Sequence, residues 1–356
     1  NAQVNMGNRG ISFGYGFLSQ EASFDIGFSL IDYDGSMSYA RAFLVGLLNT
    51  LLVSIIGIFF ATLIGVTVGI GRLSSNYLIA KGAEAYVEIF RNIPLLLQLF
   101  FWYYAALRAL PLPENAINIF DISYLTVKGW YVPKFIWTNF SVFLSSILAS
   151  IVAIIFVSKY ARKQREEIGR HVPTFSISFG ILILFPLITF LIGGVTLNFE
   201  IPVLSQMTST IYNFKGGVSI IPELISLALA LSMYTATFIA ENVRAGIQGI
   251  GKGQKEAAAS IGLTPSQILK LVIMPQALRI IIPPTTNQYL NLTKNSSLAA
   301  AIAYPDLVLV FAGTAMMQTG RAIEIVGITM ATYLTISLTI SLYMNWYNKR
   351  IAIQEK

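Results

Sequence analysis

One lysine of this sequence stands in an otherwise apolar stretch, among short polar side chains that could bind a small charged molecule. The polar neighbours of Lys294 that we single out are Asn291, Asn295, Ser296 and Ser297. A lysine at the centre of a membrane helix costs about 2.5 to 3.5 kcal/mol, so its ammonium group should face protein or water. These groups together suit the carboxylate and amine of an amino acid. The alternative is structural: Lys294 snorkels to the membrane surface or pairs with Glu88 or Asp306.

A second set of polar residues precedes another apolar stretch. Glu88 and Arg91 share one helix face through their three-residue spacing, and we interpret them as a local ion pair at the cytoplasmic mouth of a helix. Gln98 lies one to two turns deeper and is the better candidate to line a path. Glu241 and Arg244 are likewise interpreted as boundary residues.

Several kinds of chemistry are excluded by composition. The sequence has no cysteine and one histidine, His171, so thiolate metal sites, His-based metal clusters and Ser-His-Asp triads lack their residues. The run 246–252 has the spacing of a phosphate-binding P-loop, but Gly253 stands where Ser or Thr is required. We therefore predict no catalytic residue, no metal site and no ATP site on this chain.

Membrane helices must position the polar residues, because the chain is too apolar for soluble domains. Hydrophobic residues make up 55% and charged residues 12% of 356 positions, and the mean hydropathy is +0.66. Ordinary soluble domains have about 25% charged residues. Seven apolar windows are long enough to cross a bilayer. They are 42–70, 89–107, 140–158, 177–197, 220–240, a broken stretch within 278–310, and 325–346.

The basic residues indicate which ends of these windows lie in the cytoplasm. One set of loops contains 17 of the 24 Lys and Arg, and the other contains 7. The positive-inside rule puts the first set in the cytoplasm, so the net charge of +7 reports topology and not nucleic-acid binding. We expect the N-terminus of this chain outside and its C-terminus inside. Residues 1–41 contain no apolar targeting segment, so we expect a truncated or processed chain, with a missing membrane helix favoured over a cleaved signal peptide.

The most informative cytoplasmic stretch predicts two short helices joined by a tight corner. Residues 254–261 are good helix formers, and Gly262 can adopt the left-handed conformation that ends a helix. Thr264 can cap the next helix, with Pro265 in its first turn and Gln267 completing a capping box. Such a rigid elbow can be gripped by a soluble partner, whose movement would then become helix movement.

This elbow resembles the coupling loop in the membrane subunits of bacterial ATP-driven (ABC) importers. The motif of that family is Glu-Ala-Ala, three residues, then Gly, and Glu256, Ala257, Ala258 and Gly262 match it. Pro275 is expected to break the chain before the next membrane helix. Three more stretches resemble the polar amino acid branch of the family: 274–277, 88–98 and 292–298. The resemblance covers most of residues 40–350.

The resemblance implies an all-α polytopic membrane protein with the transmembrane domain of a type I ABC importer (MetI-like). Two extra helices are inserted, as in the general L-amino acid and glutamate/glutamine/aspartate/asparagine permeases of Gram-negative bacteria. The implied parts are a periplasmic segment 1–41, first core helices 42–110, an insertion 111–217, and core helices 218–350 with the coupling loop 241–277.

The implied function is that of a permease subunit that moves polar L-amino acids from the periplasm across the bacterial inner membrane. A periplasmic binding protein would deliver the amino acid, and two ATPase subunits, which carry ATP and Mg²⁺, would engage the elbow. The implied coupling residues are Glu256, Ala257, Ala258, Gly262, Pro265 and Pro275. The second membrane subunit is expected to be a paralogue in preference to a copy. Asn295 stands where the family often has Asp, which favours neutral or acidic substrates.

Two other classes of protein remain as alternatives. An ion-coupled transporter acting alone would need acidic residues at mid-membrane or inverted repeats, and the sequence has neither. A membrane-embedded enzyme would need clustered nucleophiles, bases or metal ligands within the spans. Co-purification with an ATPase that is lost when the elbow is altered would separate the importer from both.

Overall fold

The structure is a computed structural model that describes residues 14–168, 173–192, 195–208 and 211–351. His171 and the first 13 residues of the predicted periplasmic segment lie outside the described residues. The chain divides into two compact units. Unit 1 comprises residues 1–110 and 221–356, and unit 2 comprises residues 111–220. Each unit is described by itself.

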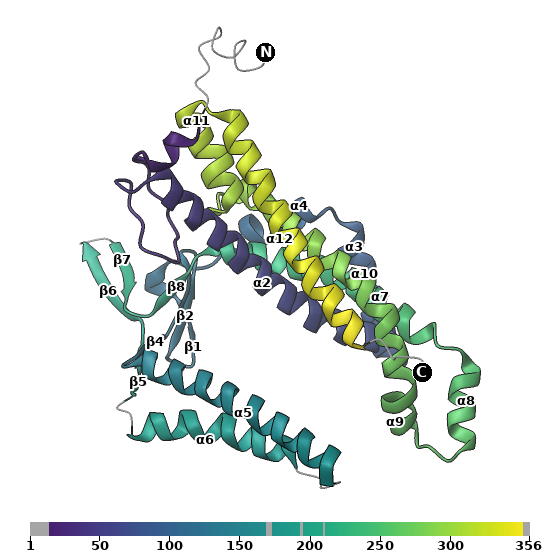
Figure 1. Ribbon diagram of the computed structural model, residues 1–356. Coiled ribbons are helices and arrows are strands. Elements are labelled where there is room, and N and C mark those ends of the chain that lie inside the picture. The colour runs from purple at the N-terminus through teal and green to yellow at the C-terminus, as the bar shows by residue number, and fades with distance from the viewer. Residues whose placement is uncertain (1–13, 169–172, 193–194, 209–210, 352–356) are drawn as a thin grey trace, which may run out of the picture. The chain divides into compact units, whose positions relative to one another are not determined.

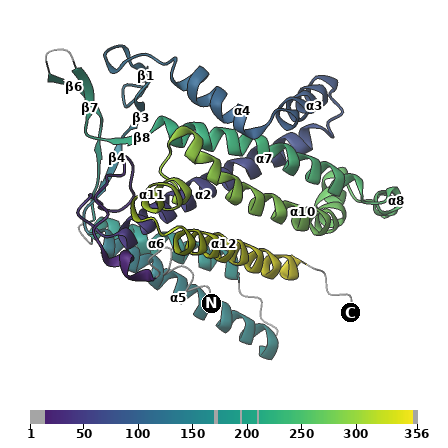
Figure 2. The same ribbon diagram turned by 90° about the horizontal axis from the view of Figure 1, so that it is seen from above.

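Unit 1 is a helical bundle (Figures 1 and 2). Its long helices are α2 (Tyr39–Gly71), α3 (Tyr77–Asn92), α7 (Pro222–Gln248), α10 (Met274–Asn295) and α12 (Ala322–Ile351). Its shorter helices are η1 (Tyr15–Ser19), α4 (Leu95–Phe100), η2 (Phe101–Leu107), α8 (Lys252–Ser260), α9 (Pro265–Gln267), η4 (Ile268–Ile273), η5 (Ser296–Ile302), η6 (Val308–Ala315) and α11 (Met316–Thr319).

Five helical runs among the described residues are long and apolar enough to cross a membrane. They are Tyr39–Gly71, Phe140–Arg165, Pro222–Gln248, Pro265–Ile302 and Ala322–Arg350. The predicted window 89–107 is instead divided, because Ile93 is extended before Pro94 and separates α3 from α4. The predicted window 177–197 contains α6, which ends at Ile192, five residues earlier than expected.

Glycines let the central helices of unit 1 approach closely. A Cβ atom at Gly65 would lie 2.6 Å from Cβ of Ile239, and one at Gly69 would lie 2.7 Å from the carbonyl oxygen of Ala240. These glycines on α2 therefore pack against α7, as their spacing predicts. A Cβ atom at Gly246 would lie 2.3 Å from Cγ1 of Ile281, so this glycine of the P-loop-like run serves the packing of α7 on α10.

One end of unit 1 is closed by the segment before α2. Phe17 is buried against Tyr39 and Phe311, with ring centroids 5.9 and 6.3 Å apart. The backbone N–H of Gly14 donates to Oε1 of Glu324 at 2.9 Å, and Arg321 donates to the Gly14 carbonyl at 2.6 Å. The segment thus holds the N-terminal ends of α2 and α12 together with η6.

Unit 2 combines a helical hairpin with short strands that were not predicted. The strands are β1 (Ile117–Ile119), β2 (Ser123–Thr126), β3 (Gly129–Val132), β4 (Lys134–Trp137), β5 (Leu197–Glu200), β6 (Val203–Thr208), β7 (Ile211–Lys215) and β8 (Val218–Ile220). All pairs are antiparallel: a sheet in the order β1-β2-β3-β8, and the two-stranded pairs β4-β5 and β6-β7. A one-turn 3₁₀ helix, η3 (Pro113–Asn115), precedes β1.

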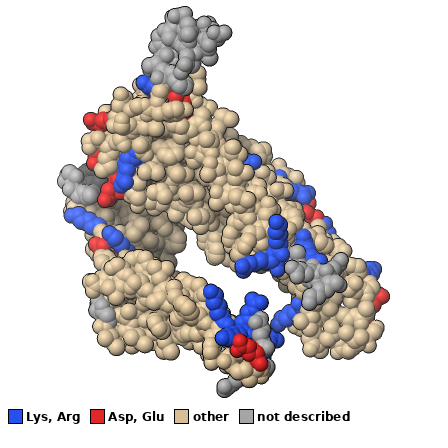
Figure 3. Space-filling model, viewed as in Figure 1, with Lys and Arg blue, Asp and Glu red and all other residues tan. Residues whose placement is uncertain are grey.

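The hairpin of unit 2 consists of α5 (Phe140–Ile168) and α6 (Thr174–Ile192). Small buried residues on α5, Ser146, Ser150 and Ala161, line its contact with α6, while long apolar side chains such as Phe156 stay exposed. Basic side chains gather at the end of the hairpin remote from the strands, and its length is almost free of charge (Figure 3). This pattern is typical of apolar helices whose basic turn lies at a membrane surface.

Candidate functional site: the elbow and a polar stripe

The elbow has the local geometry that its sequence predicts. Gly262 has φ +83°, and no neighbouring atom approaches within 4 Å of a Cβ built there, so only the backbone conformation selects glycine. The N–H of Thr264 donates to Oε1 of Gln267 at 2.9 Å, and the N–H of Gln267 donates to Oγ1 of Thr264 at 3.4 Å. This reciprocal pair is the predicted capping box, with Pro265 in the first turn of α9.

Most of the elbow surface is exposed. Glu256 and Ala257 face solvent, and Ile261 at the corner is 77% exposed, which is unusual for so large an apolar side chain. Ala258 alone in α8 is buried, and its carbonyl accepts a hydrogen bond from the N–H of Leu263 at 3.3 Å. The motif therefore contributes one small residue to the inside of the corner and presents the rest to solvent.

Pro275 does not break the chain, contrary to our expectation. The helix continues from α9 through a π-helical segment, η4, into α10, and Pro275 lies in the first turn of α10. The wider π turn precedes the proline, whose missing N–H falls where the helix changes register. The elbow is thus joined to α10 by one continuous helical run, Pro265–Ile302.

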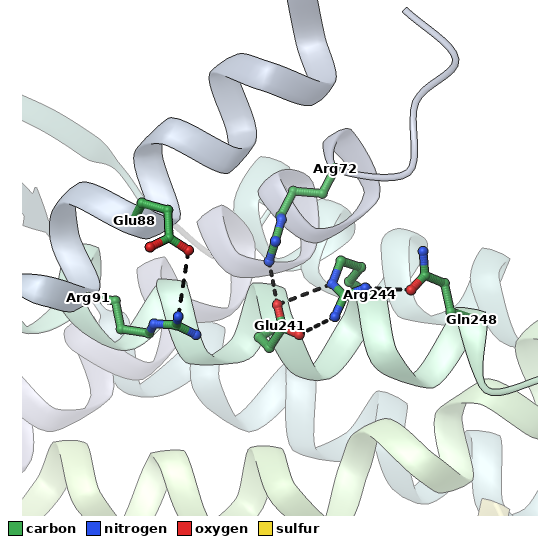
Figure 4. Close-up of polar contacts among 6 residues, drawn as sticks. All are labelled: Arg72, Glu88, Arg91, Glu241, Arg244 and Gln248. Carbon is green, nitrogen blue, oxygen red and sulfur yellow. Dashed lines mark hydrogen bonds and ion pairs between the residues drawn. The ribbon is translucent and has the colours of Figure 1, made fainter. Parts of the chain in front are cut away.

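A charged cluster lies where the C-terminal end of α2 meets the last turns of α7. Arg72, at the end of α2, and Arg244 both donate to the carboxylate of Glu241, and Arg244 also donates to Gln248 (Figure 4). The side chains of Arg72, Arg244 and Glu241 are 15%, 29% and 32% exposed. We call these four residues the clamp. Glu241 and Arg244 were predicted as boundary residues, but the part of Arg72 was missed.

Glu88 and Arg91 lie together on α3, with Arg91 Nη2 3.6 Å from Glu88 Oε1 (Figure 4). Their side chains are 52% and 38% exposed, so the pair is a surface contact. Gln98 is buried, and its Nε2 donates to the carbonyls of Phe90 and Ile93 at 2.7 and 2.9 Å. Gln98 therefore bridges the break at Pro94, and both of its donor hydrogens are directed at the backbone.

Polar residues of α10 form an exposed stripe within a membrane-spanning helix. Asn287, Asn291 and Lys294 are all exposed, and their spacing of four and three residues puts them on one helix face. We call these residues the polar stripe. Asn287 was missed by the sequence analysis, although its position four residues before Asn291 was a signal for it. Lys294 has no ion pair with any residue in the described part of the chain, so pairing with Glu88 or Asp306 is not observed.

The other polar residues near Lys294 are differently placed. Ser296 is buried and donates to the Thr293 carbonyl at 2.7 Å, and Ser297 donates to the Lys294 carbonyl at 2.8 Å. Asn295 is partly buried. Asp306 is buried, and its Oδ1 accepts from the N–H of Leu309 at 2.8 Å, so it caps η6. No group of three His, Cys, Asp or Glu within the described ranges could hold a metal ion.

Comparison with known proteins gives one family and several relatives. Residues 166–353 match the model of the family described as binding-protein-dependent transport system inner membrane component. The chain is 49% identical to the putative amino-acid ABC transporter permease protein YhdX of Escherichia coli K12, over 100% of this chain and 90% of that protein.

Two further relatives match along the whole chain. The general L-amino acid transport system permease protein AapQ of Rhizobium johnstonii is 48% identical, over 100% of this chain and 88% of its own length. The glutamate/glutamine/aspartate/asparagine transport system permease protein BztB of Rhodobacter capsulatus is 38% identical, over 100% and 89%. A solved amino acid ABC transporter shares the fold, with 20% identity, a TM-score of 0.51 and coverage of 88% of this chain and 95% of that one.

Proposed function

We propose, from the premise that this chain belongs to the family of binding-protein-dependent transport system inner membrane components, that it lines the path of a polar amino acid across the bacterial inner membrane. The chain is a permease subunit of an amino acid ABC transporter. The ion-coupled alternative has no support from these relatives.

The observation that carries the proposal is the polar stripe on α10. Lys294 lies in the last turn of α10, within the membrane-spanning run Pro265–Ile302, and an exposed ammonium group there faces lipid only at a free-energy cost, so water or another protein must cover it. A second membrane subunit placed against the stripe would enclose a polar path between the two subunits. Lys294 would then meet the carboxylate of the amino acid, and the amides of Asn287 and Asn291 would accept from its ammonium group.

The coupling step belongs to the elbow. An ATPase subunit that grips the exposed residues Glu256, Ala257 and Ile261 would move α8, and the rigid corner at Gly262 would transmit the movement to α10. Pro265 and Pro275 support this role because both lie in a continuous helical run and do not interrupt it. ATP and Mg²⁺ would bind to the ATPase subunits, and this chain would make or break no covalent bond.

The direction of insertion follows from the distribution of basic residues. The elbow contains Lys252, Lys255 and Lys270, so we assign it to the cytoplasm, together with the end of α12 that contains Lys349 and Arg350. The segment before α2 would then be periplasmic. The partners would be two ATPase subunits, a periplasmic binding protein and a second membrane subunit, for which a paralogue is preferred to a copy.

The substrates are proposed to be neutral and acidic polar L-amino acids. Glutamate, glutamine, aspartate and asparagine stand in the name of one relative, and general L-amino acids in that of another. The stripe contains one cation and no acidic residue, which favours substrates whose side chain is a carboxylate over substrates whose side chain is cationic.

The test is reconstitution of the chain in liposomes with its ATPase, the second membrane subunit and the binding protein. Uptake of labelled glutamate, glutamine and arginine is measured with and without ATP and with and without the binding protein. We expect uptake that needs both, with glutamate or glutamine ahead of arginine. Uptake by the chain alone, driven by an ion gradient, would overturn the proposal.

A further inference from the structure

The sheet of unit 2 covers one of its faces and leaves the other open. On the covered face, the rings of Tyr124 and Tyr131 contact Phe214 of β7, with centroids 4.6 and 4.8 Å apart. Tyr131 also donates to Oδ1 of Asn213 at 2.7 Å. Phe214 and Tyr131 are consequently buried. The β6-β7 hairpin is thus the cover of this face.

The opposite face has an apolar row across all four strands. Paired residues of antiparallel strands point to the same side of a sheet, and one such row runs Ile117, Leu125, Trp130 and Ile220. Val132 and Val218, paired with each other, extend it by one step. Ile117, Trp130 and Val218 are 45%, 37% and 44% exposed. We call these six residues the open apolar face.

The turn next to this face holds an aromatic residue in an unfavourable backbone conformation. Phe120, between β1 and β2, has φ +57°, a left-handed conformation that bulky residues rarely adopt, and its side chain is 89% exposed. The turn is held by the N–H of Asp121, which donates to Oδ1 of Asn118 at 2.8 Å. Neither the backbone nor the burial of Phe120 explains a phenylalanine here, so a contact outside the fold is the remaining reason.

We infer that the open apolar face and Phe120 form a docking surface for the soluble binding protein of this transporter. This inference rests on the proposed function. The strands join the ends of α5 and α6 that lie opposite Lys159, Lys163 and Arg165, and the basic end belongs to the cytoplasm. The face therefore lies on the outer side, where the binding protein that the family description specifies must meet its membrane component.

Lipid is a poorer occupant of the face than protein. Trp137, which contacts Phe140 and Phe143 at the start of α5, marks the membrane boundary as interfacial aromatic residues do. Trp130 is seven residues earlier in extended chain, up to about 23 Å away at 3.3 Å per residue. Strands β4 and β5, and not the strands of the open sheet, directly adjoin α5 and α6 along the chain. An exposed tryptophan within an aliphatic row is also the composition found at the centre of protein interfaces.

The first experiment is a Phe120→Asn substitution in the reconstituted transporter. Asparagine tolerates the left-handed conformation, so the unfolding temperature should hold or rise while the exposed ring is lost. We expect the binding-protein concentration that gives half-maximal ATP-driven uptake to rise about tenfold, with the maximal rate unchanged. Ser219→Asn, on β8 but on the side of the sheet opposite the open apolar face, is the matched control and should leave the half-saturating binding-protein concentration unchanged.

The second experiment asks what touches the face. A photoactivatable benzoylphenylalanine is introduced at Phe120, Ile117 or, as control, Ser219, and the transporter is irradiated with the purified binding protein. We expect crosslinks to the binding protein from positions 117 and 120 but not from 219. Crosslinks to lipid, to the second membrane subunit or to this chain itself would overturn the inference.

The docking surface and the proposed function fail in different ways. Wild-type transporter that shows no ATP-driven uptake would remove the proposed function and this inference with it. Wild-type uptake that depends on the binding protein, together with an unchanged half-saturating concentration in Phe120→Asn, would leave the function standing and remove only the docking surface.

Discussion

The clamp and the polar stripe both place charge in the same helical bundle, but only the clamp pairs its charges within the described part of the chain. Glu241 accepts from Arg72 and Arg244, so every charged member of the clamp has an opposite charge beside it. Lys294 is exposed and has no such partner among the described residues. The difference indicates two uses of charge: the clamp holds helix ends together, whereas the stripe needs another molecule to complete it.

Substitution of Lys294 should have the largest effect on transport. Hydrogen bonds to charged groups contribute about 1.5 to 3 kcal/mol, so Lys294→Ala should lower the initial rate of glutamate uptake roughly 10- to 100-fold. The unfolding temperature should not fall, because Lys294 has no ion pair to lose in the described structure. Lys294→Arg, which keeps the charge, should retain more uptake. If Lys294→Ala lowered the unfolding temperature but left the uptake rate per folded molecule unchanged, Lys294 would act on stability as the clamp does, and the two features would not differ.

Substitution in the clamp should act on stability in place of transport. Glu241→Gln leaves two partly buried guanidinium groups without their carboxylate, which should cost roughly 2 kcal/mol in the free energy of unfolding. Thermal unfolding in detergent measures this loss. Glu88→Gln is the control, because its pair with Arg91 is exposed and such pairs contribute at most about 0.5 to 1 kcal/mol. Equal losses in the two variants would show that the clamp is only another surface contact.

The elbow connects the two features, and its corner should be sensitive to backbone strain alone. Gly262→Val should cost about 1 to 2 kcal/mol in the docked conformation and weaken ATPase binding about 5- to 30-fold. The amount of protein in the membrane should not change. Gly253→Ala, inside α8 and equally free of neighbours, should bind the ATPase normally. Full ATPase affinity in Gly262→Val would mean that docking does not need a rigid corner.

The smallest expected effect is at the end of the stripe that the sequence analysis missed. A neutral hydrogen bond contributes about 0.5 to 1.5 kcal/mol, so Asn287→Ala should raise the half-saturating substrate concentration about 2- to 12-fold. Dose-response curves with substrate-loaded binding protein at saturating ATP measure this change. If Asn287→Ala left the half-saturating substrate concentration unchanged while Lys294→Ala strongly lowered uptake, the substrate-binding part of the stripe would consist of Asn291 and Lys294 only.

Local features of the fold were predictable where their causes are local. The capping box and the left-handed Gly262 depend on residues within four positions of each other, so residue type alone indicates them. Arg72 and Glu241 are 169 residues apart, and no local pattern could have paired them. Asn287 was within reach, because the helical period that joins Asn291 to Lys294 also reaches position 287.

Features that depend on backbone breaks or short strands were not predictable in the same way. Gln98 looked like a lining residue because of its depth in an apolar window, yet the break at Pro94 frees two carbonyls that take up its amide hydrogens. The strands of unit 2 are three to six residues long and lie between apolar windows, so a search for windows long enough to span a membrane passes over them. Their antiparallel pairing joins residues as distant as Trp130 and Ile220.

The uninterrupted run from Pro265 to Ile302 makes the helix a lever. About 40 Å of helix separates Pro265 from Asn291 at 1.5 Å per residue, so a tilt of about 5° at the elbow moves Asn291 by about 3 Å, a hydrogen-bond length. Pro283 and Pro284 lack N–H groups and give this lever a joint between its two arms. The stiffness of the helix at Pro283 and Pro284 therefore determines what fraction of a movement of the elbow reaches Asn291.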